Sequence, residues 1–222
     1  MPVIVIASPK GGAGKSTAAV LLGTELAHAG ASVTFLDCDP NGSLALWADR
    51  ATLPNRISVL TDVSETNIIK MIRNHDQDGS VVIVDLEGVA SRLVSRAISQ
   101  ADLVITPMRA TTLDATIGVR ALSLIAEEEE ALDRTISHAV VFTMTRGIRS
   151  KQHTGIEKSL KEQGVDIIEP SLMERSAFSA LFEFGGDLRS MPAQGRMERA
   201  IENAEAFAQA VFQRLSMHEG TA

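Results

Sequence analysis

Residues 3–17 form the stretch that most restricts the fold of this chain. The apolar run Val3-Ile4-Val5-Ile6 is typical of a strand buried on both faces of a sheet. A loop with three glycines in four positions follows, and after Lys15 the apolar spacing becomes helical. A strand, a glycine-rich loop and a helix N-terminus together bind anions, because backbone N–H groups and the helix dipole point at the ligand. Lys15 adds a full positive charge, so the stretch predicts a polyphosphate site.

Two nucleotide motifs compete for this loop. The dinucleotide fingerprint G-x-G-x-x-G is matched by Gly12 and Gly14, but Thr17 occupies its third glycine, although Asp37 lies where a ribose-binding acid would stand. The phosphate loop (P-loop) ends in G-K-[ST], which residues 14–16 satisfy. A lysine that reaches the β- and γ-phosphates and a hydroxyl positioned for Mg²⁺ suit a triphosphate and have no role in hydride transfer, so we favour the P-loop. The expected nucleotide contacts are Gly11, Gly12, Ala13, Gly14, Lys15, Ser16 and Thr17, with Ser16 on the metal.

Composition narrows the class of protein further. A chain of 222 residues with 45% hydrophobic residues can bury one sizeable core. A formal net charge of −7 argues against a globally basic nucleic-acid protein and leaves a local basic patch open. Cys38 is the only cysteine, which excludes an internal disulfide and fits a reducing cytoplasm. We expect no signal peptide, no membrane span and therefore no stable membrane insertion.

Apolar strand-like runs alternate with helical patterns along the whole chain. This alternation predicts an α/β protein with a mostly parallel twisted sheet and helices on both faces, of the P-loop NTPase type. We expect one ATPase domain over residues 1–217 and a frayed tail at 218–222. The predicted strands are 3–7, 32–36, 57–60, 80–84, 103–106 (stopped by Pro107), 138–143 and 165–168. The predicted helices are 16–29, 43–51, 64–75, 90–100, 112–130, 151–163, 174–184 and 196–216.

Three carboxylates follow predicted strands. Asp37 and Asp39 come after the second strand, and Asp85 follows the apolar run 81–84. Ligands of an open parallel sheet bind at the carboxyl ends of its strands, so these side chains are expected at the phosphate site. Asp85 is interpreted as a Walker B acid that holds Mg²⁺ through water. Capping of the next helix is an alternative role for Asp37 or Asp39.

The run Lys10-Gly11-Gly12-Ala13-Gly14-Lys15-Ser16-Thr17 resembles the deviant Walker A motif of the ParA/MinD family of P-loop ATPases. The resemblance implies a homodimer that sandwiches two ATP molecules, in which Lys10 reaches the phosphates bound by the other subunit. Residues 37–40 resemble the switch I element D-x-D-P of the family. That likeness implies that Asp39 contacts the attacking water and that Asp37 supports Mg²⁺ through water. Lys10, Lys15 and Asp39 are thus the expected catalytic residues.

Two segments depart from the family pattern. Thr143 and Arg146 fall where relatives contact adenine, often through an asparagine that is missing here. Pro170 opens a segment that borders the base in the family. Glu87 replaces the proline that often follows the Walker B acid, so the switch II geometry is not carried over.

The family resemblance leaves several uses of ATP open. Short ParA proteins, including the VirC branch, imply a partition ATPase that binds DNA without sequence preference, with slow hydrolysis stimulated by a ParB-like centromere-binding or cargo adaptor. A MinD-like ATPase that positions a protein machine is the alternative, and a metabolic P-loop enzyme is a third. No separate helix-turn-helix domain is expected before the first strand, and a partition protein would be cytoplasmic and associated with the nucleoid.

Basic residues and the last helix bear on that choice. Phe207, Val211 and Phe212 fall on one face of the last helix, whose polar face carries little positive charge, so core packing is favoured over membrane docking. Phosphate contacts need only local basic clusters, each of which is equally consistent with an ordinary solvated helix face. The DNA-binding candidates are Arg149 and Lys151 in one cluster, and Arg189, Arg196 and Arg199 in the second.

Overall fold

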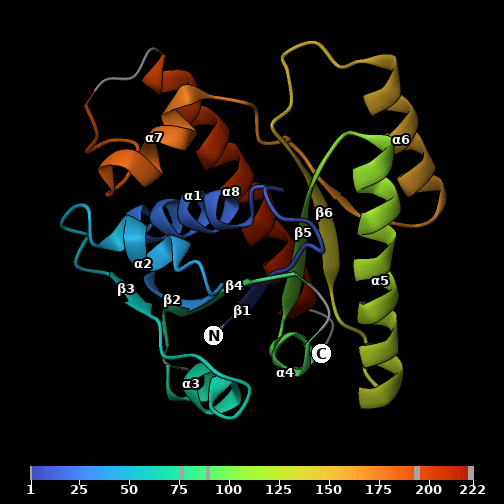
Figure 1. Cartoon of the computed structure of the whole chain (residues 1–222), viewed down its shortest axis with the longest axis horizontal. Helices are drawn as coiled ribbons and strands as arrows, with labels where there is room; N and C mark the ends of the chain where they lie inside the picture. Colours follow the sequence, from blue (N-terminus) through green and yellow to red (C-terminus); the bar gives the residue numbers. More distant parts are fainter. Residues whose placement is uncertain (1, 76–77, 89–90, 193–195, 220–222) are drawn as a thin grey trace.

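The computed structural model describes residues 2–75, 78–88, 91–192 and 196–219. Within them, seven parallel strands form one sheet in the order β3-β2-β4-β1-β5-β6-β7 (Figure 1). The strands are β1 (Val3–Ile6), β2 (Ser32–Cys38), β3 (Ile57–Leu60), β4 (Ser80–Leu86), β5 (Leu103–Arg109), β6 (His138–Thr143) and β7 (Ile167–Ile168). The helices are α1 (Lys15–His28), α2 (Ser43–Ala48), α3 (Ile68–Asn74), α4 (Arg92–Ile98), α5 (Thr112–Leu132), α6 (Lys151–Glu162), α7 (Ser176–Phe184) and α8 (Met197–Glu219).

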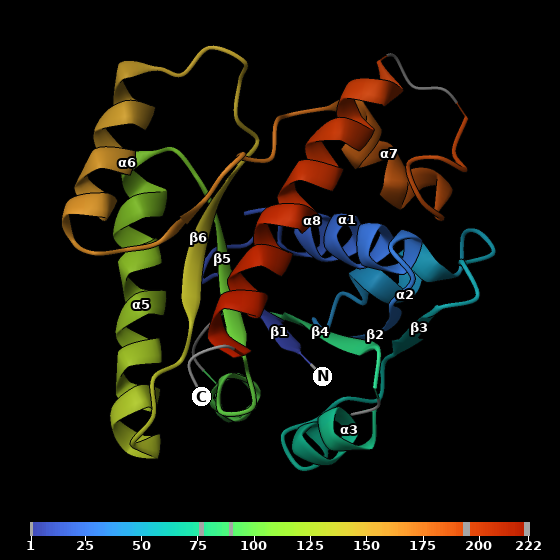
Figure 2. The ribbon, with the colours of Figure 1, turned by 180° about the vertical axis from the view of Figure 1, so that it is seen from behind.

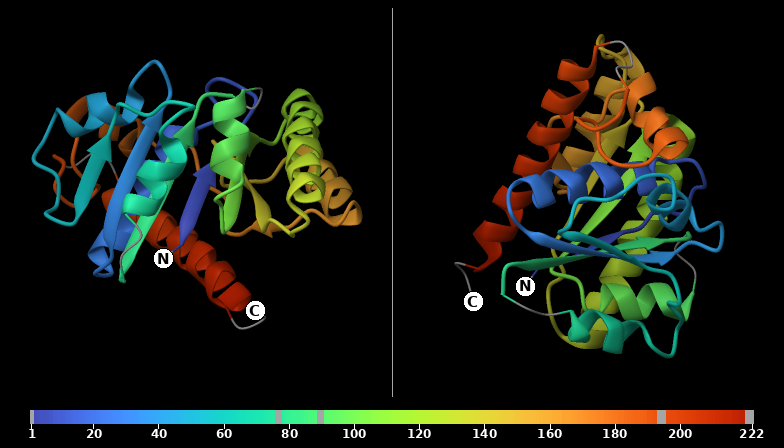
Figure 3. Two further views of the ribbon diagram at one scale, coloured as in Figure 1. Left: turned by 90° about the horizontal axis from the view of Figure 1, so that it is seen from below. Right: turned by 90° about the vertical axis from the view of Figure 1, so that its left-hand side faces the viewer.

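Helices cover both faces of the sheet, as the uninterrupted apolar strands predict. Figures 2 and 3 show α1, α2, α7 and α8 on one face, with α3 and α4 on the other. One core, which includes Leu21, Phe35 and Phe207, joins the first group of helices to the sheet. A second core, which includes Val82 and Ile98, fills the opposite side. The predicted parallel α/β architecture is confirmed.

The central strand β1 leads directly into the phosphate loop. β1 pairs with β4 on one side and β5 on the other, while the chain next continues to β2 beyond β4. The connection that follows β1 runs to one side of the sheet, and the connection that follows β4 runs to the other side. In open α/β sheets, ligands bind at the carboxyl ends of the strands at such a point. The fold places the glycine-rich loop at this point.

The prediction that Pro107 stops the fifth strand is wrong. β5 continues to Arg109, and Pro107 pairs in register with Val141 of β6. The amide of Val104 donates to Ser137 on the β6 side, and Ile105 accepts from Ala7 on the β1 side. By alternation, the nitrogen of Pro107 also faces the β1 side, beyond the last paired residue of β1. Proline is tolerated there because no ladder hydrogen bond needs its missing N–H.

Several helix boundaries also differ from expectation. α3 begins at Ile68 rather than at residue 64, because Asn67 folds the preceding residues into a turn in which its side chain bonds Ser64 N and Asp62 O. The last helix extends to Glu219, and the rest of the tail predicted to fray, like the predicted helix start at residue 90, lies outside the described residues. Phe212 does not share the buried face of Phe207, since 58% of its surface is exposed.

Substituting Gly23 tests the contact between α1 and the sheet. A Cβ atom at this position would clash with the ring of Phe35, which lies buried on β2. We expect Gly23→Ala to lower the free energy of unfolding by about 1–3 kcal/mol through overpacking. Urea denaturation measures the change.

Gly155→Ala is the matched control for that substitution. Gly155 is also helical, but a Cβ there meets open space, so the alanine should stabilise α6 by up to about 1 kcal/mol. Equal denaturation midpoints for the two variants would contradict the assigned packing.

Candidate nucleotide-binding site

The glycine-rich loop is held in place by two strands of the sheet. Thr143, the last residue of β6, donates its hydroxyl to Ala13 O at 2.7 Å. Arg109, the last residue of β5, donates to Gly12 O at 3.1 Å. Gly14 has φ 88°, a conformation that favours glycine, and a Cβ there would press against Thr143 at 3.4 Å. Anchoring at both neighbours gives the loop a defined shape before any ligand binds.

The N-terminus of α1 is free to receive an anion. Its cap residue is Gly14, so no side chain caps the first turn, and no acidic residue stands in that turn. The first N–H groups of a helix have no intrahelical partner and carry partial positive charge. Lys15 lies in the same turn with 7% of its surface exposed. Donors and charge converge as a bound polyphosphate requires.

Ser16 and Asp85 form the expected metal end of the site. β4 brings Asp85 beside the end of β1, and Ser16 Oγ donates to Asp85 Oδ2 at 2.5 Å. Asp85 is fully buried, and its other oxygen, Oδ1, has no hydrogen-bond partner. A buried acceptor without a partner beside a hydroxyl fits a hydrated Mg²⁺, which prefers oxygen ligands and keeps several waters. The described residues contain no group of three or more His, Cys, Asp or Glu side chains able to hold a metal alone, so phosphates and water would complete the shell.

Burial controls the titration of two groups here. Burial raises the pKa of Asp85 to about 7, opposed by the Ser16 hydrogen bond and the charge of Lys15. Burial, followed by the charges of Asp85 and Asp37, raises the pKa of the Cys38 thiol to about 12. A thiol with so high a pKa is a poor nucleophile, so buried Cys38 is a small packing residue of the strand end.

The Asp85→Asn variant should be more stable than the parent protein at pH 8 when EDTA removes divalent ions. The folded state keeps the Asp85 proton up to about pH 7, whereas an unfolded aspartate with pKa 3.8 has lost it. The parent therefore loses stability as pH rises from about 4 to about 7, and asparagine removes that loss. Thermal unfolding should show a Tm several degrees higher at pH 8 and a smaller difference at pH 5. Exposed Asp49→Asn serves as the control, and a pH-independent difference for Asp85→Asn would count against the assignment.

The two switch I carboxylates bond to their own chain. Asp37 accepts from Ala45 N at 2.9 Å with Oδ2 and from Asp39 N at 3.3 Å with Oδ1. It thus holds the first turn of α2, which favours the capping role over metal support. Asp39 accepts from both Asn41 N and Asn41 Nδ2 in a local turn.

Lys10 forms an ion pair with Asp114 of its own chain. Asp114 lies in the first turn of α5, where its side chain is 2% exposed and its Oδ2 has no hydrogen-bond partner. The Lys10 side chain is 34% exposed, in contrast to buried Lys15. Sequence reasoning missed both Asp114 and Arg109. Arg109 stands at the end of a buried strand and Asp114 follows shortly after it, and these positions were the only signal in the sequence.

The expected adenine contacts are only partly brought together. A cavity of about 110 Å³ beside the loop is lined by Gly14, Thr143, Leu172 and Phe178, among others. Arg146 lines a neighbouring hollow of about 540 Å³ instead. Pro170 lines neither, because the chain from residue 171 onward turns back to the loop through Leu172, whose amide donates to Phe142 O.

Two of the DNA-binding candidates are held in ion pairs. Arg149 contacts Glu157 at 2.5 Å and Glu169 at 2.8 Å. Arg189 contacts Glu25 and Glu205, each at 2.7 Å. These guanidinium groups are neutralised by paired carboxylates, which argues against a role in binding phosphates. Lys151, Arg196 and Arg199 are exposed, and Arg199 lines the same hollow as Arg146.

The parallel sheet, the glycine-rich loop and the Ser16–Asp85 contact together define a P-loop nucleotide-binding protein of the ParA/MinD type. The model of the VirC1 protein family matches residues 1–215, and the chain belongs to that family. It is 66% identical to Protein ParA of Rhizobium radiobacter, over 97% of this chain and 98% of that protein.

Solved structures show the same fold. The ATP complex of a Cyanothece McdA variant superposes with a TM-score of 0.76 at 20% identity, over 97% of this chain and 96% of that one. MinD from Aquifex aeolicus gives a TM-score of 0.71 at 17% identity, over 96% of this chain and 98% of that one. No helix in the described part of the chain is long and apolar enough to cross a membrane.

Proposed function

We propose that this protein is an ATP-switched partition ATPase. ATP binding closes a homodimer, the dimer binds DNA without sequence preference, and a ParB-like adaptor on the cargo stimulates hydrolysis. Plasmid or chromosomal DNA would be segregated or positioned in this way, in the cytoplasm at the nucleoid. The observation that carries the proposal is the pair of lysines at one loop, buried Lys15 and half-exposed Lys10. The 66% identity to a protein named ParA supports it.

The reaction is hydrolysis of the bond between the β- and γ-phosphates. Water adds to the γ-phosphorus, the bridging oxygen leaves with ADP, and a proton is released. Lys15 and the loop amides stabilise charge that develops on the phosphoryl oxygens. Asp39 orients the water, and Lys10 adds charge from the other subunit. Ser16 and Asp85 would hold Mg²⁺, Asp85 through water, and the ion would supply further charge neutralisation.

Arg146 and Arg199 are the residues we propose for contact with DNA phosphates. They share their hollow with Arg175 and with the carboxylates Glu174 and Glu202, so cations outnumber anions by one. Exposed Lys151 and Arg196 extend the candidate surface. Such contacts carry no sequence information, and their affinity falls steeply with salt.

A gel shift with arbitrary duplex DNA tests this function. Runs with ATP, ADP and no nucleotide across a salt series should show retardation that requires ATP and weakens as salt rises. Arg199→Ala should reduce the retardation and its salt dependence.

Arg56→Ala is the matched control, since Arg56 is also exposed but lies outside the basic hollow. Retardation that is the same with ATP, with ADP and without nucleotide would refute the proposal, and so would the absence of retardation. ATP-dependent association with liposomes in place of DNA would instead select the MinD-like alternative.

A further inference from the structure

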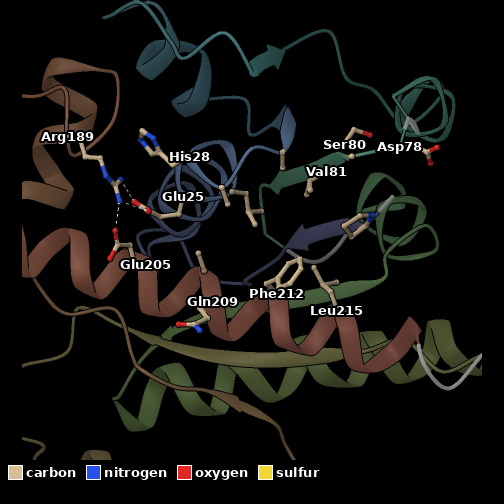
Figure 4. A pocket seen from close by; sticks show the side chains of 16 residues that line it. Glu25, His28, Asp78, Ser80, Val81, Arg189, Glu205, Gln209, Phe212 and Leu215 are labelled. Atoms are coloured by element: carbon tan, nitrogen blue, oxygen red, sulfur yellow. Dashed lines mark hydrogen bonds and ion pairs between the residues drawn. The ribbon is translucent and has the colours of Figure 1, made fainter.

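A second cavity lies at the opposite end of the sheet from the nucleotide loop. It measures about 750 Å³ and is enclosed by the C-terminal end of α1, the start of β4 and the middle of α8 (Figure 4). Apolar atoms make up most of the surface of its wall, with Leu26, Val81, Ala208 and Leu215 among the contributors. A volume of this size is typical of sites that bury an apolar group of another molecule. The nucleotide chemistry uses none of these residues.

Phe212 stands at the mouth of this cavity. The buried stripe of α8 runs through Phe207, Val211 and Leu215, and Phe212 lies one position off it. Figure 4 shows its ring on the side of α8 that faces the strands, yet 58% of its surface is exposed. A large aromatic side chain left in water beside an apolar cavity is an unused contact surface.

Acidic side chains flank the cavity at both ends. At one end, Arg189 is shared between Glu25 and Glu205, so this cluster keeps a net charge of −1. Asp78 is exposed at the other end, next to the start of β4. The apolar wall of the cavity therefore lies between two negatively charged flanks. A complementary ligand carries an apolar group between positive charges.

We propose that this cavity binds a peptide segment of a partner protein, in which apolar side chains are flanked by lysine or arginine. Acidic flanks repel nucleic-acid phosphates and anionic lipid headgroups, which argues against both of those occupants. A second copy of this chain would be paired by two-fold symmetry, which sets like-charged patches against each other. The apolar side chain of such a peptide would pack against the apolar wall, and its basic neighbours would pair with the acidic flanks.

The site is independent of the nucleotide switch. It uses the end of α1 from Glu25 to Ala29, whereas the phosphate loop meets the start of α1 about 20 Å away. A partner could stay bound here in the monomer and in a dimer closed over the phosphate loops. The inference therefore does not rest on the proposed function and can fail separately from it.

The experiment selects peptides from a phage-displayed library of random twelve-residue sequences on the full-length protein. Enriched peptides should carry an apolar residue flanked by lysine or arginine, and their affinity should agree within about twofold with ATP, ADP or no nucleotide. Phe212→Ser and Asp78→Lys should each weaken binding of an enriched peptide at least about tenfold, a loss of about 1.4 kcal/mol.

Matched controls separate this cavity from the rest of the surface. Leu46 is 56% exposed on α2, so Leu46→Ser removes a comparable apolar surface elsewhere, and Glu130→Lys reverses an exposed charge on α5. Both controls should bind the peptide as the parent does, and thermal unfolding checks that all four variants are folded. The proposal is overturned if no peptide is enriched, if enriched peptides lack basic residues, or if binding survives both cavity substitutions.

Discussion

Lys15→Ala lowers ATP affinity about a hundredfold or more. Lys15 is the charged group in the first turn of α1, and its side chain is buried where a bound phosphate would be shielded from water. A charge-assisted contact in such a place contributes about 3 kcal/mol, which corresponds to a factor of about a hundred. Calorimetric titration with a non-hydrolysable ATP analogue and Mg²⁺ measures the loss.

Lys70→Ala is the control for the charge change, because Lys70 is exposed on α3. The thermal unfolding of the Lys15 variant is recorded without nucleotide, so that a folding defect is not mistaken for lost binding. Parent-like ATP affinity in a folded Lys15→Ala protein would remove the P-loop assignment.

Lys10→Ala leaves ATP bound to the monomer but abolishes ATP-dependent dimerisation. The Lys10 side chain is 34% exposed at the surface of the loop, so it can turn outward to a nucleotide bound by another subunit. Lys15 is buried and can reach only the nucleotide of its own subunit. Light scattering with and without ATP counts the dimers, and calorimetric titration confirms nucleotide binding. Lys158→Ala, which removes an exposed lysine of α6, should dimerise like the parent.

Asp114 complicates the single substitution, because removal of Lys10 leaves a buried carboxylate without its partner. The cost in stability is less than the ~3–5 kcal/mol of a fully buried pair, because only Asp114 is buried and water already screens the 34% exposed Lys10. The double variant Lys10→Ala, Asp114→Asn removes both charges and should also fail to dimerise. ATP-dependent dimers of either variant would refute the role of Lys10 in the other subunit.

Much of the phosphate side was predictable from local sequence. Loop shape, helix start and the three residues Lys15, Ser16 and Asp85 depend on short-range patterns, since a buried apolar run followed by a polar residue fixes where a strand ends. The same reasoning failed at Pro107, because its tolerance depends on which neighbouring strand its nitrogen faces. That information exists only once β5 lies between β1 and β6.

The ion-pair partners of the charged residues also could not be predicted from the sequence. Arg149 and Arg189 belong to basic clusters in the sequence, yet their carboxylate partners come from distant segments such as Glu169 and Glu25. Asp37 likewise has a role set by where α2 begins, six residues later, because its carboxylate accepts from Ala45 N in the first turn of that helix. Long-range pairing of charges is decided by packing, which no local pattern encodes.

Trp47 gives the molecule a built-in optical probe. It is the only tryptophan, and the chain has no tyrosine, so near-ultraviolet emission comes almost entirely from one indole. That indole is buried on α2, lies edge-on to Phe35 and donates to Gly186 O at 2.9 Å. The helix that carries it is tethered by Asp37 at the end of β2. A rearrangement of the segment between β2 and α2 on nucleotide binding would therefore change the emission of the unlabelled protein, in real time and without an attached dye.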